Sequence, residues 1–139
     1  MTSAAPLTPD QIGLIRDTFH MLEPDPVIAE RFYDRLFQIA PELRPLFRPD
    51  MTGQGMRFMT TLGVIVQHLD DPKALEPYVR RLAQGHAAYG VKPVHFRPMG
   101  QALIDTMRAA LGRRFPKGAD KAWMAAYDHL AQRMIELGG

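Results

Sequence analysis

Apolar residues recur every three or four positions along nearly the whole chain, which is the spacing of one face of an α-helix. One such stripe, for example, is formed by Ile28, Phe32 and Leu36, and Pro41 ends it. The alternating pattern that is typical of strands does not occur. We therefore expect an all-α protein, with helices at about residues 9–22, 26–40, 54–69, 72–89, 93–112 and 120–137, a short helical turn at 41–47 and a loop at 48–53.

Capping residues mark the ends of several of these helices. Thr8 and Gln11 have the spacing of a capping box around Pro9, which suits the first position of a helix. Pro72 follows an aspartate in the same way, and Gly90 is a natural C-terminal stop for the helix that Pro72 begins. These signals support the helix starts that the apolar pattern predicts.

Length and composition are those of one soluble domain spanning residues 1–139, with 46% apolar and 23% charged residues. The net charge is +2 and the basic residues form only short pairs, so we expect no nucleic-acid partner. The longest apolar stretch, at 62–66, is too short to cross a membrane. There is no cysteine and no signal-peptide pattern at residues 1–5, and we expect a cytoplasmic protein without membrane partners.

The spacing of the histidines favours a cofactor over a metal ion held by protein side chains alone. A zinc-type site needs three or four converging ligands, and no motif of the common enzyme classes is present. Haem supplies four nitrogens itself and needs only one histidine from the protein. His86 continues the apolar stripe of Val79 and Leu82, and its neighbours are small. This pattern is also that of an ordinary core histidine, and the residues alone leave both readings open.

Several segments, in order, resemble one family. Residues 31–37 (RFYDRLF) and 40–47 (APELRPLF) resemble the second helix and the following corner of bacterial globins of the flavohaemoglobin and single-domain haemoglobin branch. Residues 83–91 (AQGHAAYGV) resemble the proximal histidine region. The last two helices of the family are matched at residues 95–96, 99–103, 122–123 and Tyr127. The resemblance covers about residues 8–137. It implies the globin fold, a three-over-three helical sandwich around one haem b (iron protoporphyrin IX).

The resemblance also implies the residues of the site. His86 would be the proximal iron ligand, and Tyr33 and Gln54 would form a distal pair on the opposite side of the haem. Each of these two residues also has a purely structural alternative. Tyr33 could be a core tyrosine whose hydroxyl bonds a backbone carbonyl, and Gln54 could be an exposed residue at the start of a helix. The apolar walls of the site would be formed by Phe47, Phe58, Leu82, Val91 and Phe96.

Two functions are compatible with this resemblance. The first is reversible binding of dioxygen, with carbon monoxide and nitric oxide as other diatomic ligands, for storage, delivery or sensing. The second is an enzyme, a nitric oxide dioxygenase or a peroxidase-like protein, served by a separate reductase. The branch places a tyrosine at Phe96 and a glutamate near Gly138, and Glu136 is out of phase with that position. Because charged partners make a ligating histidine more electron-donating, these departures favour binding over turnover.

Overall fold

The computed structural model describes residues 7–22, 27–47, 52–88 and 92–138, and at 52–56, 86–88 and 138 it describes the backbone alone. All regular structure in these ranges is helical, and none of the helices there has the length and apolar character to cross a membrane. The elements are α1 (Pro9–Leu22), α2 (Val27–Ile39), the 3-10 helix η1 (Pro41–Leu46), α3 (Thr52–Gln67), α4 (Pro72–Ala88), the 3-10 helix η2 (Pro93–His95), α5 (Phe96–Leu111), the 3-10 helix η3 (Gly112–Arg114) and α6 (Ala119–Gly138).

The capping box that opens α1 is confirmed. The Thr8 backbone N–H donates to the Gln11 side-chain oxygen at 2.9 Å, and the Gln11 N–H donates to the Thr8 hydroxyl at 3.1 Å. At the second predicted cap, Asp71 Oδ1 accepts a hydrogen bond from the Ala74 N–H at 3.2 Å at the start of α4. Local polar groups thus fix the starts of both helices, as their sequences predict.

Two predicted helix boundaries are wrong by a few residues. Helix α3 begins at Thr52, inside the predicted loop, because the first-turn N–H groups of a helix need no intrahelical partner and Gly53 is tolerated there. The helix predicted from Pro93 begins with the 3-10 turn η2, and α5 starts at Phe96. Pro98 explains the shift, because it has no N–H to give to Val94 and therefore must lie within the first turn of an α-helix.

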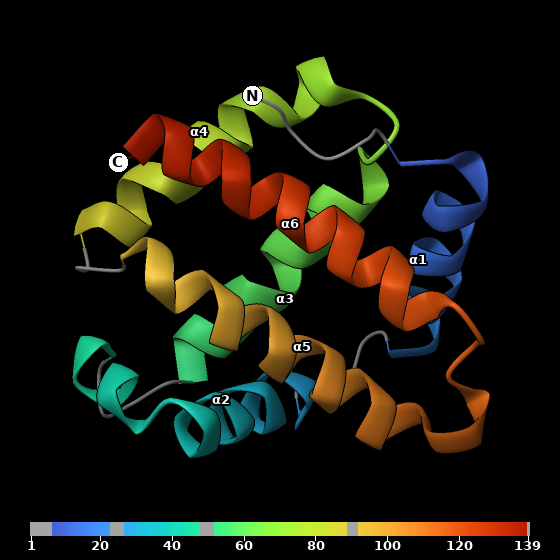
Figure 1. The fold of residues 1–139 in the computed structure, drawn as a ribbon, viewed down its shortest axis with the longest axis horizontal. Helices are drawn as coiled ribbons and strands as arrows, with labels where there is room; N and C mark the ends of the chain where they lie inside the picture. Colours follow the sequence, from blue (N-terminus) through green and yellow to red (C-terminus); the bar gives the residue numbers. More distant parts are fainter. Residues whose placement is uncertain (1–6, 23–26, 48–51, 89–91, 139) are drawn as a thin grey trace.

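The long helices pack as a layered bundle. Helices α5 and α6 lie side by side at the front of Figure 1, and α3 crosses behind them. Helix α2 packs against α5, α4 packs against α6, and α1 contacts both α6 and α3. Segments distant in sequence therefore meet around a common interior.

The main apolar cluster joins α1, α2, η1, α3, α5 and α6. Its most completely buried apolar side chains are Ile15 of α1, Leu36 of α2, Leu43 of η1 and Met107 of α5. Burying a side chain of this size stabilises the fold by about 1.5–3 kcal/mol relative to its exposure. This cluster supplies most of the buried apolar surface of the described chain.

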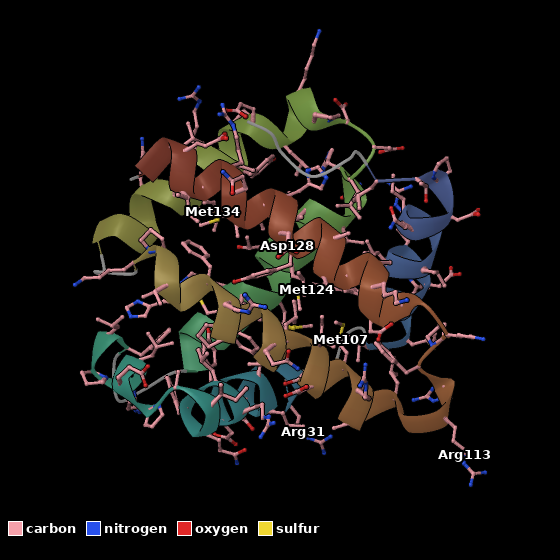
Figure 2. The ribbon with its side chains drawn as sticks, in the orientation of Figure 1. Arg31, Met107, Arg113, Met124, Asp128 and Met134 are labelled. Atoms are coloured by element: carbon pink, nitrogen blue, oxygen red, sulfur yellow. The ribbon has the colours of Figure 1, made fainter. Side chains whose placement is uncertain are left out.

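A second apolar cluster lies along α4 and has no buried residue in common with the first. Its buried members are Val79 and Ala83 of α4 and Met134 of α6. Met134 lies toward the C-terminal end of α6, and Met107, of the main cluster, lies on α5 (Figure 2). The partly buried residues around the second cluster are Leu75, Leu82, Phe96, Leu130 and Leu137. Helix α4 is therefore held to the bundle mainly through α6 and the beginning of α5.

The contact between α5 and α6 is close at Gly100. A Cβ atom on Gly100 would lie 2.7 Å from Tyr127 Cδ2 and 2.8 Å from Tyr127 Cε2. Real Cβ atoms do not approach ring carbons so closely, so the ring of Tyr127 occupies the space that a side chain at position 100 would need.

We predict that Gly100→Ala lowers the free energy of unfolding by about 1–3 kcal/mol, because the added methyl group overpacks this contact. Gly13→Ala in α1 is the matched control, since a Cβ there meets nothing within 4 Å. The control should gain about 0.5–1 kcal/mol from the better helix propensity of alanine. Urea denaturation of both variants measures the difference, and a Gly100→Ala protein as stable as the control would contradict the prediction.

Candidate functional site

Three of the predicted site residues come together in one aromatic group. Tyr33 of α2 lies with its ring centroid 5.6 Å from that of Phe47, edge to face, and 6.0 Å from that of Phe58 in α3. Phe32 stacks on Phe58 at 4.7 Å with its plane tilted by only 9°. Because aromatic pairs at these separations attract one another, α2, α3 and the end of η1 hold the Tyr33 ring from several sides. The contribution of Phe32 to this group was not predicted, although its position beside Tyr33 was visible in the sequence.

The hydroxyl of Tyr33 is a hydrogen-bond donor on a mostly buried side chain. The residue is 7% exposed, and burial raises the pKa of its phenol to about 12, while the nearby positive charge of Arg57 lowers it by less. Within the described part of the chain this hydroxyl makes no hydrogen bond, so the alternative role, a bond to a backbone carbonyl, is not seen there. The hydroxyl is therefore a donor that no described protein group engages, although it is not among the fully buried polar atoms without a partner, of which the described residues show only Trp123 Nε1.

Two other predicted residues belong to the second apolar cluster. Leu82 of α4 and Phe96 of α5 both pack against the cluster of Val79, Ala83 and Met134. The residues predicted to form the walls of the site therefore belong to two clusters. Phe47 and Phe58 pack against the main cluster, and Leu82 and Phe96 pack against the second one.

The remaining predicted residues are described in part or not at all. His86 lies within α4, and its helical register follows that of Val79 and Leu82, but its side chain lies outside the described atoms. Gln54 lies in the first turn of α3, one turn before Phe58, and its side chain is likewise outside them. Val91 lies outside the described residues altogether.

A charged network that sequence reasoning missed ties α4 to α6. Arg133 Nη2 lies 2.7 Å from Glu76 Oε2, and Arg133 Nε donates to Glu76 Oε1 at 3.2 Å. The hydrogen bonds from Arg133 lower the pKa of Glu76. Arg133 Nη1 also contacts Glu136 Oε1 at 3.3 Å, and Arg80 contacts Glu76 at 3.3 Å. Only the Arg80–Glu76 and Arg133–Glu136 pairs have local spacings that a sequence can reveal, because Glu76 and Arg133 are 57 positions apart.

Glu136 therefore lies on the outer side of α6. Its side chain is half exposed and is paired with Arg133. The expectation that Glu136 is out of phase with the position of a glutamate partner for His86 agrees with this placement. Position 138, where the family has that glutamate, lies outside the described side chains.

Comparison with known proteins identifies the class of this all-helical chain. The globin family model matches residues 30–134, which is most of the chain. The chain belongs to the globin family.

Its relatives include bacterial flavohemoproteins. A flavohemoprotein of Vibrio cholerae is 32% identical over 137 residues, which cover 96% of this chain and 35% of that protein. The chain thus spans about a third of the length of this relative.

Solved structures of globins superpose on the model over nearly its whole length. The bacterial globin of Campylobacter jejuni has a TM-score of 0.82 at 23% identity and covers 94% of this chain and 96% of its own. An engineered carbene transferase, from a putative nitric oxide dioxygenase of Rhodothermus marinus, has a TM-score of 0.85 at 28% identity and covers 95% and 93% of the two chains. The predicted globin fold is therefore confirmed.

Membership of the globin family implies a haem cofactor, and the described residues fit one. A flat apolar macrocycle needs apolar side chains on both of its faces, and the described residues supply them in two clusters, the main one and the one along α4. Tyr33, whose hydroxyl bonds no described group, belongs to the main cluster. Beyond Leu82 of the other cluster, α4 continues to His86, and an imidazole is a suitable iron ligand.

Proposed function

We propose that this globin binds dioxygen reversibly, for storage, delivery or sensing, with His86 as the proximal ligand of haem b and Tyr33 and Gln54 as the distal pair. The observation that carries the proposal is the Tyr33 hydroxyl, which belongs to a mostly buried side chain packed on Phe47 and Phe58 and bonds no described group. Haem iron, when bound, supplies the open coordination position at which a diatomic gas binds. The protein's own residues donate the hydrogen bond to the gas and hold the iron ligand.

Tyr33 donates a hydrogen bond to the gas. A phenol with a pKa of about 12 keeps its proton throughout the physiological range, so it acts as a donor and never as an anion that competes for the iron. A donor in a water-poor site is stronger than one in water, because the low local dielectric does not screen it. The rings of Phe47 and Phe58 hold the phenol in place and exclude water from around it.

Gln54 supplements Tyr33 from the first turn of α3. It is one turn from Phe58, whose ring contacts Tyr33, and this register supports its assignment to the same side of the site. A side-chain amide offers both a donor and an acceptor, so Gln54 is suited to orient the phenol and to reach the gas.

The proximal side favours a carrier over an enzyme. Phe96 has no hydroxyl to offer to a histidine, and Glu136 is paired with Arg133 at the surface. Neither residue gives His86 a charged partner, and a neutral imidazole without such a partner donates less electron density. Apolar packing by Leu82, Val91 and Phe96 would then hold the proximal ligand.

The second candidate function is nitric oxide dioxygenation, in which one nitric oxide, one dioxygen and one electron give one nitrate. The description of the Rhodothermus relative as a putative nitric oxide dioxygenase favours it, as does the kinship with flavohemoproteins. Such an enzyme needs an electron for every nitrate formed, and a separate reductase would have to supply it here.

His86→Ala should abolish or greatly weaken haem retention, because no other residue of the proposed site replaces the imidazole. His68→Ala is the control, since His68 Nδ1 lies within hydrogen-bonding distance of Val64 O, at 2.9 Å, near the end of α3 and serves the helix locally. Absorption spectra and haem content of the purified proteins measure the effect. An unchanged spectrum in His86→Ala would refute the assignment of the iron ligand.

Tyr33→Phe should speed dioxygen dissociation by roughly 10–150-fold, because a hydrogen bond to a charged group contributes about 1.5–3 kcal/mol. Carbon monoxide gains little charge on binding, so its dissociation should change little. Stopped-flow dissociation of both gases makes the comparison, with Tyr78→Phe as a control for loss of a hydroxyl from a more exposed ring on α4. Because Gln54 can replace the lost donor, Tyr33→Phe combined with Gln54→Leu should show the full effect. Wild-type dioxygen dissociation in this double variant would exclude the proposed distal pair.

The isolated wild-type chain should consume at most one nitric oxide for each reduction of its iron. A nitric oxide electrode records consumption with nicotinamide cofactor alone and then with an added flavin reductase. Sustained turnover without the reductase would contradict the binding function, whereas rapid turnover only with it would support the second candidate.

A further inference from the structure

Tyr127 of α6 lies against the first two turns of α5. Its ring fills the space beside Gly100, as the short distances from a built Cβ to Cδ2 and Cε2 show. Its hydroxyl donates to the backbone carbonyl of Phe96 at 2.5 Å. Phe96 precedes Gly100 by one helical turn, so the ring and the hydroxyl of a single side chain contact both residues. Gly100 makes this possible, because any side chain there would push the ring away.

The hydroxyl of Tyr127 is a permanent donor. Burial raises the pKa of this phenol well above its usual value, and the neighbouring Asp128 raises it further. Phe96 follows the N-cap His95, and its carbonyl is also the expected acceptor of a helical hydrogen bond in the first turn of α5, from the Gly100 N–H. The tyrosine therefore reinforces the turn at which α5 begins, directly after η2.

The side chain of Phe96 packs against the second apolar cluster, whose buried members are Val79 and Ala83 of α4 and Met134 of α6. Val79 and Ala83 lie in the helical stretch just before His86. In the described residues this cluster, the Glu76–Arg133 pair and the other contacts of α4 with α6 are what hold α4 in the bundle. A shift of Phe96 therefore disturbs the cluster in which α4 and α6 pack together.

We propose that Tyr127 is a positioning residue for the proximal side of the site: by holding the Phe96 backbone it fixes the Phe96 ring against the cluster of Val79, Ala83 and Met134, and so the helix that carries His86. The inference rests on the proposed haem site and adds a residue to it. Tyr127 contacts neither the cofactor nor the gas in this assignment, and it acts through Phe96.

Tyr127→Phe tests the proposal, because it removes only the hydroxyl. We expect haem transfer from the ferric protein to excess apomyoglobin to become roughly 2–10-fold faster, the range that corresponds to loss of one ordinary hydrogen bond. The iron–histidine stretching band in the resonance Raman spectrum of the ferrous protein should also shift or broaden. Ile15→Val is the matched control, since it destabilises the buried core on α1, away from α4, and should leave both readings unchanged.

A double-mutant cycle separates positioning from general stability. If Tyr127 acts through Phe96, the effects of Tyr127→Phe and Phe96→Leu on the rate of haem loss should be less than additive, whereas independent structural roles would give additive effects. Additive effects, or equal rates in Tyr127→Phe and the wild type, would overturn the inference and leave the proposed function intact.

Two further outcomes complete the test. A wild-type protein that binds no haem would contradict the proposed function and this inference with it. If Tyr127→Phe does not fold, Gly100→Ala decides, because the added methyl group displaces the Tyr127 ring: faster haem loss than in Ile15→Val supports the positioning role, and an equal rate refutes it.

Discussion

The division of the apolar core into two clusters is the constraint on which the rest of this globin depends. Most buried side chains join one cluster, while Val79, Ala83 and Met134 form another along α4. Helix α4 packs extensively on α6, but its buried apolar residues do not join those of the main cluster. A flat cofactor that contacts both clusters would connect them, and it would then be a part of the core as well as the centre of the proposed chemistry.

The two sides of this division carry different kinds of chemistry. On one side, aromatic rings surround a phenol whose burial keeps it protonated. On the other, the described contacts of α4 combine apolar packing, ring contacts of Tyr78 with His68 and Arg81, and ion pairs of Glu76 with Arg80 and Arg133. Glu136 is engaged with Arg133. In the proposed assignment, a polar donor on the gas side and the absence of a charged partner for the histidine would suit retention of a ligand more than its reduction.

The helix that carries the proposed ligand is held from outside the site. Arg133 reaches Glu76 across the α4–α6 contact, and Tyr127 reaches Phe96 across the α5–α6 contact. Both residues belong to α6, so this helix acts as a common support for α4 and for the start of α5. Substitutions in α6 far from the iron can therefore change the properties of the site without touching it.

The sequence by itself determined the helices, the capping box of the first helix and the family, because these depend on residues within about one turn of each other or on short motifs in a fixed order. It also identified Tyr33, Phe47 and Phe58 as members of one site through the resemblance, and the structure brings them into contact. Only the tertiary structure decided which apolar stripes share a cluster, that Arg133 pairs with Glu76, and that Tyr127 bonds Phe96 over Gly100. These contacts join positions 31 and 57 residues apart, and they depend on how the helices cross, which the local periodicity of the sequence does not specify.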